Sequence, residues 1–164
     1  MKTSIPPIAP ARRSYSSMLN NYLLAIERIL LTLWAGSLWA AGFLVAPTLF
    51  ALLDDRALAG TIAGNLFTKV GYVGLVCGSG LLLLQWLLKR GAGWRLWALV
   101  TMLALVVIIQ FGLTPMLAEL RVQGLSGSAR FGQLHALTGG LYLVTSMLGM
   151  ALVAAGQPKP LHPR

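Results

Sequence analysis

The sequence LWALVTMLALVVIIQFGLTPMLA, residues 96–118, decides the fold. It contains no charged residue, and at about 1.5 Å of rise per residue a helix of this length is about 35 Å long. The hydrocarbon core of a bilayer is about 30 Å thick, and a helix satisfies all of its backbone hydrogen bonds internally. We therefore predict that this segment is a transmembrane helix.

Three further apolar runs have similar lengths, and short polar or basic segments separate them. We predict membrane spans over residues 29–53, 70–88, 96–118 and 131–157. The predicted fold is an all-α, polytopic membrane protein that forms a four-helix bundle over residues 29–157. Residues 1–28 are expected to form a cytoplasmic N-terminal tail and the entry to helix one. Residues 158–164 are expected to form a cytoplasmic C-terminal tail.

The composition supports a membrane protein. Of the 164 residues, 57% are hydrophobic and only 10% are charged, and the mean hydropathy is +0.75. A soluble domain of this size needs far more polar surface. The net charge of +9 does not indicate nucleic-acid binding, because the Lys and Arg residues flank the apolar runs and form no basic stripe between aromatic residues. Membrane lipid is the expected partner.

The distribution of basic residues predicts the orientation. With four spans, nine of the 13 Lys and Arg residues fall on the side of the termini and four on the other side. Basic residues are enriched on the cytoplasmic side, so we expect both termini in the cytoplasm and the protein in a bacterial inner membrane. The first apolar run is too long for a cleavable signal peptide. Trp39 is expected between helices. The other four tryptophans are expected at the cytoplasmic head-group level: Trp34, Trp86, Trp94 and Trp97.

The two helix pairs resemble each other. When the chain is shifted by 68 residues, Pro47 falls on Pro115 and Gly71 falls on Gly139, together with further Phe, Leu and Gly matches. Such self-similarity indicates an internal repeat, and an offset of two helices makes the two repeats parallel. We predict a pseudo-twofold bundle in which Pro47 and Pro115 bend equivalent helices. Each kink either serves packing or releases a carbonyl for a ligand.

Polar residues on the fourth span are the main candidate site. His135, Gly139, Tyr142 and Ser146 recur at helical spacing, so they share one face of the helix. Polar groups within a membrane need partners, so this face either binds other helices or lines a polar cavity. A histidine with an ordinary interfacial hydrogen bond is the simpler alternative. Polar groups expected near His135 at the outer mouth are Gln110, Thr114, Lys69, Asp54, Asp55 and Glu119.

Small residues indicate where helices pack closely. Glycine lets two backbones approach, and it is therefore enriched at helix contacts in membranes. The residues expected at such contacts are Trp34, Gly36, Gly71, Gly74, Gly78 and Gly139.

The sequence carries no enzyme motif. Its four acids lie outside the predicted spans, and Cys77 is the single cysteine. Catalytic triads, phosphate-binding glycine loops, paired carboxylates and clusters of metal ligands are absent from the sequence. We expect no catalytic residue, no cofactor and no metal site, and therefore a protein without enzymatic activity.

The chain resembles a family of small four-helix membrane proteins designated domain of unknown function 4149, which includes transmembrane protein 205. The resemblance covers about residues 30–154. It implies the bundle and singles out Trp34, Pro47 and His135, but it implies no substrate because the family has no agreed activity. The residues that carry it are Trp34, Gly36, Trp39, Gly42, Phe43, Pro47, Phe50, Leu66, Phe67 and the run 131–135.

Two classes of function follow from these features. The first is a non-enzymatic bundle, including a homo-oligomeric one, that transports or senses a small solute or a cation along the polar face of the fourth helix. The second is a structural or assembly partner that docks into a larger membrane complex through the glycine faces of the first two helices. A membrane redox or metal enzyme ranks third.

Overall fold

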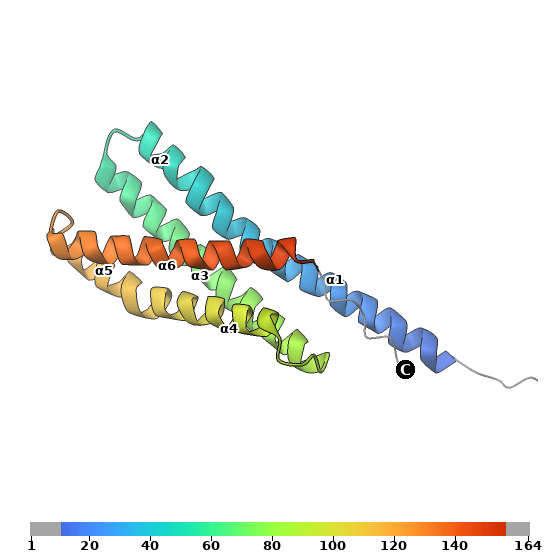
Figure 1. The fold of residues 1–164 in the computed structure, drawn as a ribbon. Helices are drawn as coiled ribbons and strands as arrows, with labels where there is room; N and C mark the ends of the chain where they lie inside the picture. Colours follow the sequence, from blue (N-terminus) through green and yellow to red (C-terminus); the bar gives the residue numbers. More distant parts are fainter. Residues whose placement is uncertain (1–10, 157–164) are drawn as a thin grey trace, which may run out of the picture.

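The computed structural model describes residues 11–156, with side chains from residue 18 onward. Its regular elements are all helices, and π-helical segments η1 and η2 join their flanking α-helices directly. The chain forms a first hairpin of α1, η1, α2 and α3 and a second hairpin of α4, η2, α5 and α6 (Figure 1). The bounds are α1 (Ala11–Trp39), η1 (Ala40–Val45), α2 (Ala46–Leu52), α3 (Arg56–Leu87), α4 (Trp94–Val107), η2 (Ile108–Leu113), α5 (Thr114–Val122) and α6 (Ala129–Ala154).

Four helical stretches within the described residues are long and apolar enough to cross a membrane. They are Met18–Leu52, Arg56–Leu87, Trp94–Val122 and Ala129–Ala154. Large apolar side chains are exposed on each of them, for example Leu44, Val76, Phe111 and Val144. Such a surface is unfavourable in water, and lipid is the solvent that covers it. The prediction of an all-α, four-span membrane protein is confirmed.

The helices extend beyond the predicted spans. Residues 11–28, predicted as tail and entry, already belong to α1, whereas residues 1–10 and the predicted tail over 158–164 lie outside the described residues. α3 begins well before the predicted start at residue 70, because Asp55 caps it. The Asp55 carboxylate accepts hydrogen bonds from the backbone N–H groups of Ala57 and Leu58 at 2.8 and 3.1 Å.

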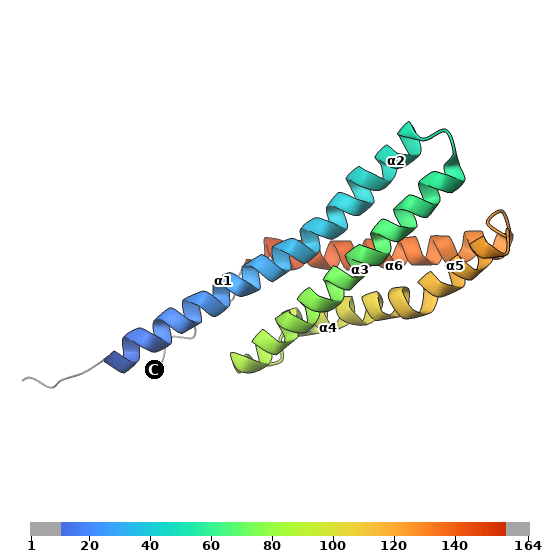
Figure 2. The ribbon, with the colours of Figure 1, turned by 180° about the vertical axis from the view of Figure 1, so that it is seen from behind.

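The two hairpins cross each other. α1 packs against α3 and α6, and α4 packs against the same two helices. Beyond the crossing, the hairpins diverge toward α2 and α5 (Figures 1 and 2). We call the end with residues 53–55 and 123–128 the open end, and the end with the 88–93 turn the closed end.

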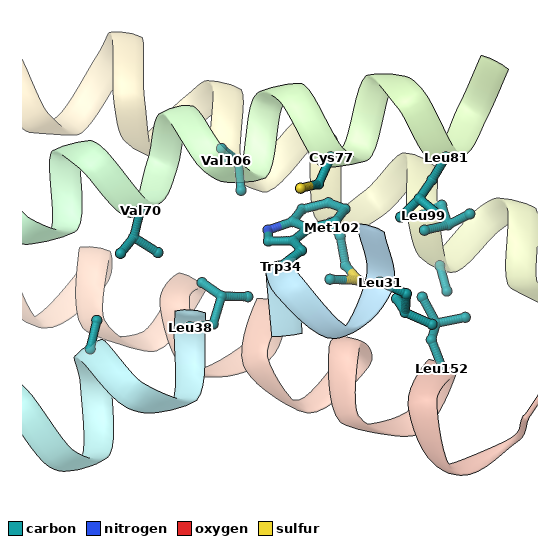
Figure 3. Packing of buried hydrophobic residues seen from close by; sticks show 12 residues of the cluster. Leu31, Trp34, Leu38, Val70, Cys77, Leu81, Leu99, Met102, Val106 and Leu152 are labelled. Atoms are coloured by element: carbon teal, nitrogen blue, oxygen red, sulfur yellow. The ribbon is translucent and has the colours of Figure 1, made fainter. Parts of the chain in front are cut away.

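The apolar core lies where the hairpins cross (Figure 3). Trp34 is fully buried there, and a Cβ on Gly74 would lie 2.6 Å from its indole Nε1. The prediction of Trp34 at the head-group level is therefore wrong, because Gly74 and Gly78 leave room for the ring inside the bundle. Around it lie Leu31, Leu38, Val70, Cys77, Leu81, Leu99, Met102, Val106 and Leu152.

A buried ionic cluster joins the helices at the closed end. Glu27 on α1 is 5% exposed, and its two carboxylate oxygens accept hydrogen bonds from Arg90 Nη1 at 2.9 and 2.8 Å. Arg95 on α4 lies 4.0 Å from the same carboxylate and donates to the backbone oxygens of Leu152 and Gly156. Glu27, which lies outside the predicted spans, thus connects α1 to the 88–93 turn and to α4, and Arg95 extends the cluster to the end of α6.

The π-helical segments occupy matching places in the two hairpins. η1 begins at Ala40 and η2 at Ile108, which are 68 positions apart, the offset of the predicted repeat. Pro47 and Pro115 each follow as the second residue of the next α-helix. A proline has no N–H to donate, and a widened turn is one way in which a helix accommodates it. The two predicted kinks therefore coincide with two π-helical turns.

Candidate ligand cavity

A cavity of about 820 Å³ lies between the two hairpins at the open end. Both hairpins line it, and most of the lining side chains are apolar. Sites for small organic molecules in proteins typically have volumes of about 300–1,000 Å³ and walls of this kind. The lining residues fall within four stretches, 38–50, 60–71, 106–122 and 138–145, with His135 beside the last.

The cavity exists because the hairpins diverge and because its walls are rich in glycine. α2 packs against α3, and α5 packs against α6, each within its own hairpin. Side chains fill the interior where the hairpins cross. The space between the two helix pairs is not filled in this way. The glycines in its lining are Gly42, Gly60, Gly64, Gly71 and Gly139.

Tyr142 and Gln110 bridge the hairpins on the side of the cavity nearest the crossing. The Tyr142 hydroxyl on α6 donates to the carbonyl of Leu38 on α1 at 2.6 Å. Gln110 in η2 is buried, and its side-chain amide donates to the carbonyl of Thr68 on α3 at 3.3 Å. Because each bond satisfies a polar group inside the bundle, the two residues hold the hairpins together where the cavity begins.

Arg121 lies on the open-end side of the same cavity. Its Cζ is 5.5 Å from the centroid of the Phe131 ring, and Phe131 stacks on His135 with centroids 6.0 Å apart. A Cβ on Gly64 would lie 2.8 Å from Arg121 Nη1, so the guanidinium reaches from α5 to the backbone of α3. In the sequence Arg121 is one of the basic residues that flank the apolar runs, and no local motif marks it.

Four of the five predicted polar candidates line the cavity: His135, Gln110, Thr114 and Tyr142. Ser146 lies deeper and is fully buried. Its hydroxyl donates to the carbonyl of Tyr142 at 2.9 Å, and its own carbonyl accepts a hydrogen bond from Trp39 Nε1 at 3.3 Å. Ser146 and Trp39 therefore connect α6 to α1 and do not face a ligand.

The loop acids and Lys69 do not join His135. None of them lines the cavity, Asp55 caps α3, and Glu119 accepts a hydrogen bond from Gln123 at 3.1 Å. Within residues 11–156, no three His, Cys, Asp or Glu side chains lie close enough together to hold a metal ion. The polar neighbours of the cavity are thus amide, hydroxyl, imidazole and guanidinium groups.

The glycines predicted at helix contacts have different surroundings. Gly71 lies against Gln110, and Gly74 and Gly78 lie against Trp34, so these three positions are used inside the chain. Around Gly36 and Gly139, by contrast, no atom lies within 4 Å of an added Cβ. The glycine face of α3, on which the assembly hypothesis relied, is therefore occupied by the protein's own helices.

Positions 68 residues apart line the cavity from both hairpins. In several such pairs the second hairpin supplies the polar member, so that its wall is the more polar one. The pairs are Leu38 and Val106, Gly42 and Gln110, Ala46 and Thr114, Phe50 and Ala118, Phe67 and His135, Val70 and Thr138, and Gly71 and Gly139.

Residues 29–126 match the family described as domain of unknown function (DUF4149), which is more than half of the chain. The chain belongs to the DUF4149 family. The predicted family is thereby confirmed, and the match includes Gln110, Thr114 and Arg121 of the cavity. His135 and Tyr142 of this DUF4149 protein lie beyond the matched residues. Searches of curated proteins and of solved structures returned no match.

Proposed function

We propose that this protein binds a small, mainly apolar organic solute in the cavity between its hairpins, as the binding step of transport or sensing. The observation that carries the proposal is a cavity of about 820 Å³ with a mainly apolar wall into which polar side chains are interspersed. This combination is typical of binding sites for organic molecules. In this proposal the protein acts by binding and not by catalysis.

The lining favours an organic solute over a cation. Calcium and magnesium prefer carboxylate and carbonyl oxygens as ligands. Among the described lining residues, the charged side chain is the guanidinium of Arg121. A cation in the cavity would therefore meet repulsion from Arg121 and no compensating carboxylate.

The ionic cluster at the closed end supports ligand access to the cavity from the open end. Glu27, Arg90 and Arg95 join the helices there, whereas the hairpins diverge at the open end. From the distribution of Lys and Arg we place the open end outside the cytoplasm and the protein in a bacterial inner membrane. The matching π-helical segments and lining positions further support parallel repeats about a pseudo-twofold axis.

This orientation predicts the labelling of two exposed turns. In a Cys77→Ala background, Ser126→Cys places a thiol at the open end, and Ala92→Cys places one at the closed end. A membrane-impermeant maleimide should modify Ser126→Cys in spheroplasts, and Ala92→Cys only after the membrane is permeabilised. The opposite pattern would contradict the orientation, and modification of both thiols before permeabilisation would contradict the four spans.

Filling the cavity should weaken binding. Gly139 lines the cavity and has open space beside it, whereas its neighbour Gly140 has the same open space but does not line the cavity. We expect Gly139→Trp to reduce labelling by a photoreactive twelve-carbon alcohol in zwitterionic nanodiscs. Each buried CH₂ contributes about 0.8 kcal/mol, so room lost for two methylene groups weakens binding about tenfold.

Gly140→Trp is the matched control, since it adds the same side chain to the same helix on a face away from the cavity. Its labelling curve should superimpose on that of the unmodified protein, with the labelled peptides within residues 38–50, 60–71, 106–122 and 135–145. Labelling that does not saturate, or that falls equally in both variants, would rule out a specific site in the cavity.

A further inference from the structure

Arg121 places a positive charge in the wall of a mainly apolar cavity. The ion pairs among the described residues both involve Glu27, at the opposite end of the bundle. An arginine has five N–H donors, and Arg121 is partly exposed, so that its donors are accessible from the cavity. The side chains around Arg121 supply aromatic and glycine contacts, and no ion pair with Arg121 occurs among the described residues, so its charge is available to an anionic ligand.

The neighbours of Arg121 hold its guanidinium in position. Phe131 lies beneath it at 5.5 Å and is itself stacked on His135, while Gly64 lets one nitrogen approach the backbone of α3. A side chain at position 64 would occupy this space. A guanidinium that is already ordered loses less freedom on binding, and its planar donors match a carboxylate or phosphate.

Below Arg121, the cavity offers space for an apolar chain. From Arg121 to Gln110 the wall rises through eleven helical residues, about 16 Å along the axis. The lining over this distance includes Leu117 and Ala118, with Phe43 facing from the first hairpin. This depth and polarity suit an acyl or alkyl chain of medium length, with its end near the crossing.

The divergence of the hairpins suggests where such a ligand enters. Phe43, Phe50 and Leu143 line the cavity and are each about half exposed, so the cavity is not closed along this side. In a membrane-spanning bundle an unclosed side of this kind faces the bilayer, so we infer that lipid reaches the cavity there as well as at the open end. A molecule that is already dissolved in the bilayer can slide its chain between the hairpins while its head stays near the interface.

We propose that the solute is a single-chain amphiphile with an anionic oxygen head group, a carboxylate or a phosphate, and that Arg121 binds this head while the cavity holds the chain. This inference rests on the proposed function and specifies its ligand class. Charge-assisted hydrogen bonds contribute enough for at least tenfold tighter binding than a neutral head allows. Arg121 therefore determines specificity in this site.

Competition against the photoreactive alcohol in zwitterionic nanodiscs tests the inference. Dodecanoate and dodecyl phosphate should displace the alcohol at concentrations about tenfold or more below those needed for dodecanol. Arg121→Gln should abolish this difference by weakening displacement by dodecanoate and dodecyl phosphate. Arg130→Gln removes the same charge from an exposed position outside the lining and should keep the difference.

The remaining outcomes separate the two proposals. If dodecanol competes as well as dodecanoate in the unmodified protein, the head-group inference is wrong and the apolar site remains. If acetate or inorganic phosphate alone displaces the alcohol, the ligand is a free anion and the amphiphile is excluded. If the alcohol does not label the cavity at all, the proposed function fails first. Loss of dodecanol binding in Arg121→Gln would show a structural role and would overturn the assignment of specificity.

Discussion

Gly74→Leu should prevent α1 and α3 from packing in their native arrangement at the core of the bundle. A Cβ at this position would lie 2.6 Å from Nε1 of Trp34, and that indole is fully buried and also packed against Gly78. Because a fully buried ring has no free space into which it can move, the cost should exceed about 3 kcal/mol, the upper end of the usual range for overpacking. Cys77, the single cysteine, is buried nearby, so its reaction with a thiol-specific dye reports loss of the core.

We expect the Gly74→Leu variant to react at temperatures at which the unmodified protein is protected. Gly140→Leu is the control, because a Cβ there meets no atom within 4 Å. A second change, Trp34→Ala, removes the ring that causes the clash and should recover part of the lost protection. If the double variant were no more protected than Gly74→Leu alone, the contact with Trp34 could not be the cause.

Glu27→Gln should destabilise the closed end strongly. The change leaves Arg90 and Arg95, whose side chains are 18% and 14% exposed, without the carboxylate between them. Breaking a buried ion pair by removing one partner costs about 3–5 kcal/mol. For a protein of this size, each kcal/mol lowers Tm by about 2–4 °C, so Tm should fall by about 6–20 °C.

The same Cys77 dye reaction, followed during heating, measures this change. Glu119→Gln is the matched control, because Glu119 is exposed and its partner Gln123 can donate to a glutamine oxygen equally well. Its Tm should stay within about 2 °C of the unmodified protein, as expected for an exposed polar substitution. Equal shifts in the two variants would show that the Glu27 cluster does not stabilise the fold.

The sequence was sufficient to predict the membrane class, the four spans and the family. Long apolar runs form helices in lipid, because a helix satisfies its own backbone hydrogen bonds. The sequence predicted their ends less well. Hydropathy alone separates the polar stretch after Asp55 from the second predicted span. The Asp55 carboxylate nevertheless caps the helix, so that α3 already begins at Arg56. Capping acts through the geometry of a few N–H groups, and a window of mean hydropathy does not detect it.

The cavity could be predicted only in part. Helical spacing placed His135 and Tyr142 on one face of α6, and both line the cavity. Arg121 and Glu27 were not recognised, because their roles depend on which residues of other helices lie opposite. Gly64 gives Arg121 its space, and Arg90 gives Glu27 its partner, over separations that no local pattern encodes.

The π-helical turns change the angular phase of each helix. A turn that holds one residue more than an α-turn shifts every later side chain by one position, about 100° around the axis. Four residues at strict steps of four all line the cavity: Leu38, Gly42, Ala46 and Phe50. In a regular α-helix, side chains at this spacing would rotate gradually around the helix axis and away from the cavity. Beyond η2 the same insertion directs Arg121 into the cleft, so deleting a single residue between 108 and 113 would turn that charge toward a different side of the bundle.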